Sequence, residues 1–175
     1  HEGMWAHMAN PATREAIANG LVEMMNKPYP VYKKNLKPEE MVGECLATTW
    51  SGECDYSKYQ LAGYVSIDGI DFDYEKAARL TEQENRNLEA LIDLIRNKVG
   101  MSKILSLTTY HVGADPVECD NPSVFENCSY IEPDRYSHND EVIYILKNIK
   151  DNIDFFNVIA YEAGLNFKYD IAICK

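Results

Sequence analysis

The chain has 175 residues, of which 46% are hydrophobic and 26% are charged, and this composition is typical of a globular domain. Its 28 acidic residues outnumber the 17 basic ones, and the formal net charge of -11 disfavours nucleic acids and anionic membrane surfaces as partners. No apolar run approaches the roughly 20 residues that a membrane-spanning helix needs. We therefore expect a globular domain with no nucleic-acid partner and no membrane insertion.

The first predicted helix begins at Asn10-Pro11, where asparagine is a favoured N-cap residue and proline suits the first helical position. Apolar residues then recur at helical spacing, at Ile17, Leu21, Met24 and Met25. Pro28 ends the pattern. Residues 26–60 contain further prolines and no clear period, and they are longer than a usual connection. We interpret them as an irregular insertion on the surface.

An acidic stretch from Asp68 to Glu75 follows, with the sequence DGIDFDYE. Its acids alternate with apolar residues, which predicts a β-strand with one polar and one apolar face. Asp71, Asp73 and Glu75 would share the polar face. Because adjacent carboxylates repel one another, we expect this set to hold at least one proton at neutral pH, which suits acid/base chemistry.

Two alternative interpretations of the acidic stretch are a solvated run of charges and a calcium-binding EF-hand loop, which opens with the same spacing of acids. That loop requires glycine at its sixth position and glutamate at its twelfth. Counting from Asp71, the sixth residue is Lys76, although the twelfth is Glu82, and apolar residues lie between the acids. We therefore expect no metal ion and no cofactor at this site.

The next predicted helix begins with the capping box Thr81-Glu82-Gln83-Glu84 and ends at Gly100. Its apolar positions follow helical spacing, at Leu88, Leu91, Ile92, Ile95 and Val99. Beyond it the pattern predicts a strand, a loop, a helix and a second strand, over 103–110, 111–136, 139–150 and 153–161. Such a strand–helix repeat predicts a parallel sheet.

Active sites of parallel sheets lie at the C-terminal ends of the strands. Glu75, Tyr110 and Tyr161 each close a predicted strand at that end, and Asn157 shares a face with Tyr161. We therefore predict that these side chains lie at one edge of the sheet.

Four of the five cysteines form two short pairs, Cys45 with Cys54 and Cys119 with Cys128, in polar stretches rich in turn formers. Their spacing is wider than metal ligands prefer, so we favour two local disulfides, with four free thiols as the alternative. Disulfides are typical of a secreted or lumenal protein.

The acidic stretch from Asp68 to Glu75 resembles the DGxDxDxE signature of glycoside hydrolase family 18 at every fixed position. Residues 155–162, FFNVIAYE, are similar to the sixth-strand pattern of that family. The resemblance implies a (β/α)8 TIM barrel, an α/β fold of which residues 1–175 would supply about strands 4 to 6. The rest of the barrel would be a partner, and 26–60 and 111–136 would be surface insertions in an interior segment of a longer protein.

The resemblance implies hydrolysis of β-1,4 linkages with retained configuration, in which the N-acetyl oxygen of the substrate is the nucleophile. Glu75 would be the general acid and then the base. Asp73 would orient the N-acetyl group, Asp71 would lie beneath Asp73, and Tyr161 would contact the N-acetyl carbonyl oxygen.

Other positions would have supporting roles. Tyr110 and Asn157 would contact substrate, Asp68 would be structural at the strand entrance, and Gly69 would serve the backbone geometry. The substrate would be chitin, chitooligosaccharides or the chitobiose core of N-glycans. The alternative is a chitinase-like lectin or structural glycan-binding protein with weak or no activity, although such proteins often lack the final glutamate that is present here as Glu75.

Overall fold

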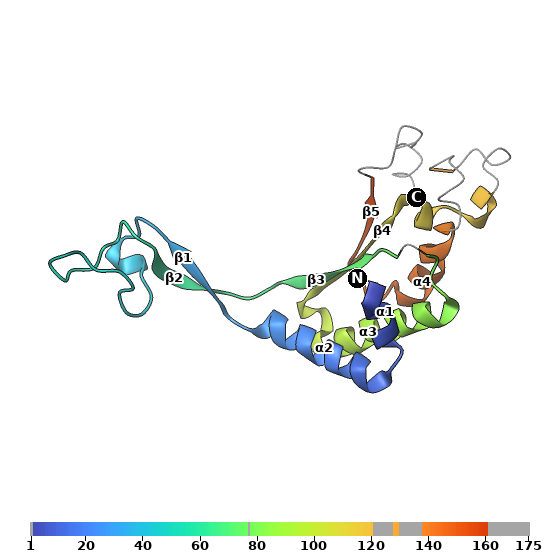
Figure 1. Ribbon diagram of the computed structural model, residues 1–175, viewed down its shortest axis with the longest axis horizontal. Coiled ribbons are helices and arrows are strands. Elements are labelled where there is room, and N and C mark those ends of the chain that lie inside the picture. The colour runs from blue at the N-terminus through green and yellow to red at the C-terminus, as the bar shows by residue number, and fades with distance from the viewer. Residues whose placement is uncertain (1, 77, 121–127, 130–137, 161–175) are drawn as a thin grey trace. The chain divides into compact units, whose positions relative to one another are not determined.

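The structure, a computed structural model, describes residues 2–76, 78–120, 128–129 and 138–160, and the chain divides into two compact units (Figure 1). We call His1–Val22 with Gly69–Lys175 the sheet unit, and Glu23–Asp68 the ribbon unit. The acidic stretch lies almost entirely in the sheet unit.

The sheet unit is built on three parallel strands in the order β3-β4-β5: β3 (Gly69–Tyr74), β4 (Ile104–Tyr110) and β5 (Phe155–Ile159). Helix α3 (Glu82–Val99) connects β3 to β4, and α4 (Glu141–Ile149) precedes β5. The predicted strand–helix repeat and its parallel pairing are confirmed. The side chains that end the strands therefore lie toward one edge of this sheet.

The predicted TIM barrel is wrong. A barrel closes when the last of its parallel strands bonds to the first, whereas β3 and β5 each pair on one side only within the described residues. The other two described strands form a separate antiparallel sheet. The described chain is a mixed α/β protein with a two-stranded antiparallel sheet and a three-stranded parallel sheet.

Helix α2 (Pro11–Asn26) begins where the sequence predicts it. The side-chain oxygen Oδ1 of Asn10 accepts hydrogen bonds from the backbone N–H of Ala12 at 2.9 Å and of Thr13 at 3.3 Å. These bonds satisfy donors that the first turn of a helix leaves unpaired.

The capping box of α3 is also confirmed. Thr81 Oγ1 accepts from the Glu84 N–H at 3.2 Å, and Glu84 Oε2 accepts from the Thr81 N–H at 2.8 Å. Gly100 caps the other end with a positive φ of 59°, a conformation that favours glycine. The predicted apolar positions Leu88, Leu91, Ile92 and Ile95 are buried.

Helix α1 (Glu2–Met8) was not predicted, because its short sequence has no apolar period. It is ordered by packing instead, since Trp5 and Met8 are buried. The rings of Trp5 and Tyr74 meet edge to face, with centroids 5.5 Å apart. A seven-residue helix is marginal alone, so these contacts account for its presence.

The ribbon unit contains β1 (Tyr29–Lys33) and β2 (Gln60–Val65), which pair in antiparallel fashion, and the short 3-10 helix η1 (Pro38–Glu40). The irregular structure predicted for 26–60 is therefore wrong for β1. Between the strands, the buried side chain of Gln60 donates to Ala47 O at 3.1 Å and accepts from Leu46 N–H at 2.8 Å. One amide side chain thus organises the intervening loop.

Both predicted disulfides are confirmed, Cys45–Cys54 in the ribbon unit and Cys119–Cys128 in the sheet unit. Disulfides of this kind are typical of secreted proteins. No helix in the described part of the chain is long and apolar enough to cross a membrane. The remaining short 3-10 helices are η2 (Gly100–Ser102), η3 (His111–Ala114) and η4 (Val117–Asp120).

Arg96 joins α3 to the starts of two strands, and it is buried. Its guanidinium donates to Gly100 O at 2.8 Å, Lys103 O at 2.9 Å and Asn152 O at 2.8 Å. It also contacts Asp154 Oδ2 at 2.7 Å. A planar group with five donors can make all these bonds at once, which a lysine cannot.

Candidate active site

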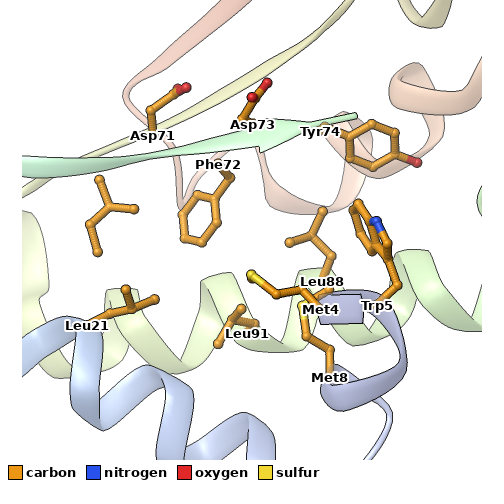
Figure 2. A pocket seen from close by; sticks show the side chains of 11 residues that line it. Met4, Trp5, Met8, Leu21, Asp71, Phe72, Asp73, Tyr74, Leu88 and Leu91 are labelled. Atoms are coloured by element: carbon orange, nitrogen blue, oxygen red, sulfur yellow. The ribbon is translucent and has the colours of Figure 1, made fainter. Parts of the chain in front are cut away.

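The acidic face of β3 carries Asp71 and Asp73, both exposed. Figure 2 shows these two side chains on one side of the strand and Phe72 on the other, facing Leu88 and Leu91. This arrangement follows from the pleat of a strand, in which successive side chains point to opposite faces. The alternation in the sequence therefore gives one face for chemistry and one for packing.

Asp71 is held by the neighbouring strand. Its Oδ1 accepts a short hydrogen bond from Ser106 Oγ and a second bond of 2.9 Å from Thr108 Oγ1. Asn157 of β5 donates to Thr108 Oγ1 at 3.2 Å. The paired register places Asp71 beside Ser106 and Thr108 beside Asn157, so one hydrogen-bonded row crosses all three strands.

Asp73 lies one step further along this face, beside Thr108 of β4 in the register of the sheet. Glu75 follows the last residue of β3, and its N–H donates to Asp73 O at 3.1 Å in a tight turn. The side chain of Glu75 is half-buried. The three predicted carboxylates are thus consecutive alternate positions at the C-terminal end of β3.

The residue after Glu75 is engaged elsewhere. Lys76 Nζ contacts both carboxylate oxygens of Glu84, at 2.8 and 3.0 Å. Burial acts to raise the pKa of Glu84, but hydrogen bonds from Lys76 and Thr81 outweigh it and lower the pKa. The ammonium group of Lys76 therefore forms an ion pair with the first turn of α3.

The N-terminal end of β3 is closely packed. A Cβ atom on Gly69 would lie 2.1 Å from Ile104 O, so only glycine fits at this point of the β3–β4 pair. Asp68 precedes the strand and is exposed, at the end of the ribbon unit. Gly69 therefore allows the backbones of β3 and β4 to lie close together.

The opposite face of β3 borders an apolar cavity of about 260 Å³ (Figure 2). Side chains from α1, α2, α3 and β3 line it, including Met4, Trp5, Leu21, Phe72 and Leu91. The helices that cover this face support the strand from behind, while the acidic face carries the polar network.

A second cluster of polar side chains is buried near the end of β4. Glu141 Oε2 lies 2.7 Å from His138 Nδ1, and the ring of His138 meets the ring of Tyr110 edge to face with centroids 5.5 Å apart. Glu141 Oε1 accepts a short hydrogen bond from the Leu80 N–H. Sequence reasoning missed this pair, although its i,i+3 spacing at a predicted helix start was a usable signal.

The predicted site residues are brought together in part. Asp71, Asp73 and Glu75 lie at the end of β3, Asn157 joins their row through Thr108, and Tyr110 contacts His138. Tyr161 lies outside the described residues. Ser106 and Thr108, which bond Asp71, were not among the predicted site residues.

Among the residues that the structure describes, no cluster of three or more histidine, cysteine, aspartate or glutamate side chains is arranged to hold a metal ion. No protein-family model, no curated protein and no solved structure matches the chain. The function must therefore be argued from the geometry of the site and the signature of its residues.

Proposed function

We propose that the protein hydrolyses β-1,4 linkages of N-acetylglucosamine glycans with retention of configuration. The observation that carries this proposal is the position of Asp71 and Asp73 on one exposed face of β3, with Glu75 directly after the strand. The resemblance of the Asp68–Glu75 stretch to the signature of glycoside hydrolase family 18 supports it. The glycan is chitin, a chitooligosaccharide or the chitobiose core of an N-glycan.

In the proposed reaction Glu75 gives its proton to the glycosidic oxygen as the bond from that oxygen to the anomeric carbon breaks. The N-acetyl oxygen of the same sugar forms a new bond to the anomeric carbon, giving an oxazolinium intermediate. A water molecule then gives a proton to the Glu75 carboxylate and attacks the anomeric carbon, as the bond from that carbon to the N-acetyl oxygen breaks. Two displacements at one carbon retain its configuration.

The carboxylates before Glu75 have distinct roles in this proposal. Asp73 orients the N-acetyl nitrogen and stabilises the positive charge of the intermediate, and Tyr161 binds the N-acetyl carbonyl oxygen. Asp71 accepts hydrogen bonds from Ser106 and Thr108, so its carboxylate has a fixed position next to Asp73 on the same face of β3. Asn157 and Tyr110 contact the glycan at the same edge of the sheet.

The proposed location is secreted or lumenal, where N-acetylglucosamine glycans occur. The two disulfides support this location, because thiols stay reduced in the cytosol. The net charge of -11 suits an uncharged glycan better than a polyanion.

The decisive experiment compares the full-length polypeptide with its Glu75→Gln variant on chitooligosaccharides and on N-glycoproteins. The variant keeps the shape of the side chain and loses its proton, so kcat should fall about 10²–10⁴-fold. Glu39→Gln is the matched control, since Glu39 is an exposed glutamate in η1 of the ribbon unit. Unchanged activity in Glu75→Gln would refute the acid assignment.

Two further readouts test the mechanism itself. Proton NMR of the first products should show the β anomer, and oligomers of glucosamine without N-acetyl groups should not be cleaved, because they lack the nucleophile. Glycan binding by the wild type with no turnover would instead support the lectin alternative.

A further inference from the structure

Glu141 is a buried carboxylate at the first position of α4, with 3% of its surface exposed. A buried charge is costly unless hydrogen bonds satisfy it. Both oxygens of Glu141 have partners: Oε1 accepts from the Leu80 N–H, and Oε2 lies 2.7 Å from Nδ1 of His138. Since His138 is also buried, the two side chains form one enclosed pair.

Leu80 belongs to the connection between β3 and α3, which begins at Glu75. A second bond links this connection to the same region, because Arg79 Nη1 donates to Asn139 O at 2.6 Å. Asn139 and Glu141 are both at the start of α4, 60 and 61 residues further along the chain than their partners. Arg79 and Leu80, which lie four and five residues after Glu75, are therefore both bonded to the start of α4.

Tyr74, the residue before Glu75, is held by a hydrogen bond to α3. The hydroxyl of Tyr74 donates to Asn85 Oδ1 at 2.7 Å, and this tyrosine is buried. Burial raises the pKa of Tyr74, and the negative charge of Glu141 raises it further, so the hydroxyl stays protonated and donating. Hydrogen bonds therefore hold the chain on both sides of Glu75, at Tyr74 before it and at Arg79 and Leu80 after it.

We propose that Glu141 is a positioning residue for Glu75, holding the β3–α3 connection from α4 with His138 as its second anchor. The inference rests on the proposed function only in taking Glu75 as the acid. Glu141 does not touch substrate. Its effect follows because a displacement of about 1 Å at a catalytic group can cost about 10²-fold in rate.

Two other contacts of the connection, one at each of its ends, do not involve Glu141. Lys76 contacts Glu84, and Thr81 caps α3 through its own side chain. Loss of Glu141 should therefore loosen the segment around Leu80 while α3 stays formed. The geometry of Glu75 would change without loss of the fold.

The test uses Glu141→Ala and Glu141→Gln in the full-length polypeptide, with kcat and KM on a chitooligosaccharide and amide hydrogen exchange by mass spectrometry. In Glu141→Ala, kcat should fall about tenfold or more with KM nearly unchanged, and the peptide containing Leu80 should lose protection. Glu141→Gln keeps an oxygen that can accept from Leu80, so it should restore protection and part of kcat.

Ile145→Ala is the matched control, because Ile145 is fully buried in the same helix and bonds nothing in the connection. It should lower the melting temperature by at least as much as Glu141→Ala while leaving kcat and Leu80 protection unchanged well below that temperature. An equal fall of kcat in both variants would reduce Glu141 to a general stability role and overturn the proposal.

The two readouts separate this inference from the proposed function. An active wild type whose kcat survives Glu141→Ala overturns the positioning role alone. In a wild type without turnover the proposed function fails, and the exchange of Leu80 still decides whether Glu141 holds the connection. Unchanged protection in Glu141→Ala overturns the inference in either case.

Discussion

The two faces of β3 differ in everything but their backbone. On one face Phe72 and its neighbours meet three helices around an apolar cavity, and on the other Asp71 and Asp73 are exposed beside polar side chains of β4 and β5 (Figure 2). Alternate residues of one six-residue strand thus divide packing from chemistry. Activity and stability should therefore be separable by substitution at adjacent positions of β3.

Substitution on the acidic face should change activity most. In the proposed reaction Asp73 stabilises the positive charge of the intermediate, so Asp73→Asn should lower kcat/KM about 10²–10³-fold. The melting temperature should stay the same, because Asp73 is exposed. Steady-state kinetics and thermal unfolding check both halves, with Asp151→Asn at another exposed aspartate as the control. A large loss of stability in Asp73→Asn would contradict the division.

The next effect belongs to the apolar face. Leu91 is fully buried in α3 and lines the cavity, so Leu91→Ala should lower the free energy of unfolding by about 2–5 kcal/mol. Denaturant titration measures this loss. Below the melting temperature, kcat should match the wild type, since Leu91 lies on the side of β3 opposite the carboxylates of Asp71 and Asp73 (Figure 2). A drop in kcat of the size expected for Asp73→Asn would show that the two faces of β3 are not functionally separate.

Gly69 tests the backbone that the two faces share. The Cβ atom of Gly69→Ala would overlap Ile104 O, and pushing β3 away from β4 should cost about 1–3 kcal/mol of stability. Because the register of β3 sets the position of Asp71 beside Ser106, activity should fall together with stability. Denaturant titration and kinetics on one preparation check the coupling. Gly20→Ala is the control, because a Cβ there meets no atom within 4 Å.

The smallest effect is pH-dependent and lies away from both faces. The Leu105 N–H and then Arg96 lower the pKa of Asp154 from its ordinary value of 3.8. A folded-state pKa below the unfolded value means that this stabilisation is present above about pH 4 and is lost as the pH falls through the folded value. The melting temperature of Asp154→Asn should therefore lie below the wild type at pH 7 and converge with it in acid.

Local signals predicted much of the sheet unit. The helix ends are fixed by bonds between residues only a few positions apart, at Asn10, at the Thr81 capping box and at Gly100. Such bonds can be predicted from the sequence. The alternation around Asp71 gave the strand and its two faces for the same reason. What these signals share is that both partners lie on the same short segment.

The errors have the opposite origin. Helix α1 depends on the contact between Trp5 and Tyr74. These two residues are about 70 positions apart in the sequence, so no local pattern predicts their contact. Strand β1 was missed because it contains Pro30, a residue that is rare inside strands, and because its partner β2 lies beyond a long loop. The barrel came from extending a short motif to a whole architecture, whereas strand closure depends on residues far from that motif. The Glu141–Leu80 bond was hidden in the same way.

Arg96 has a consequence for how the sheet unit opens. One guanidinium bonds the end of α3, the start of β4 through Lys103 and the approach to β5 through Asn152 and Asp154. None of these segments can detach alone without leaving a buried donor unpaired. The three segments should therefore exchange their amide protons together, as one cooperative unit whose slowest members lie farthest from the edge of the sheet that carries Glu75.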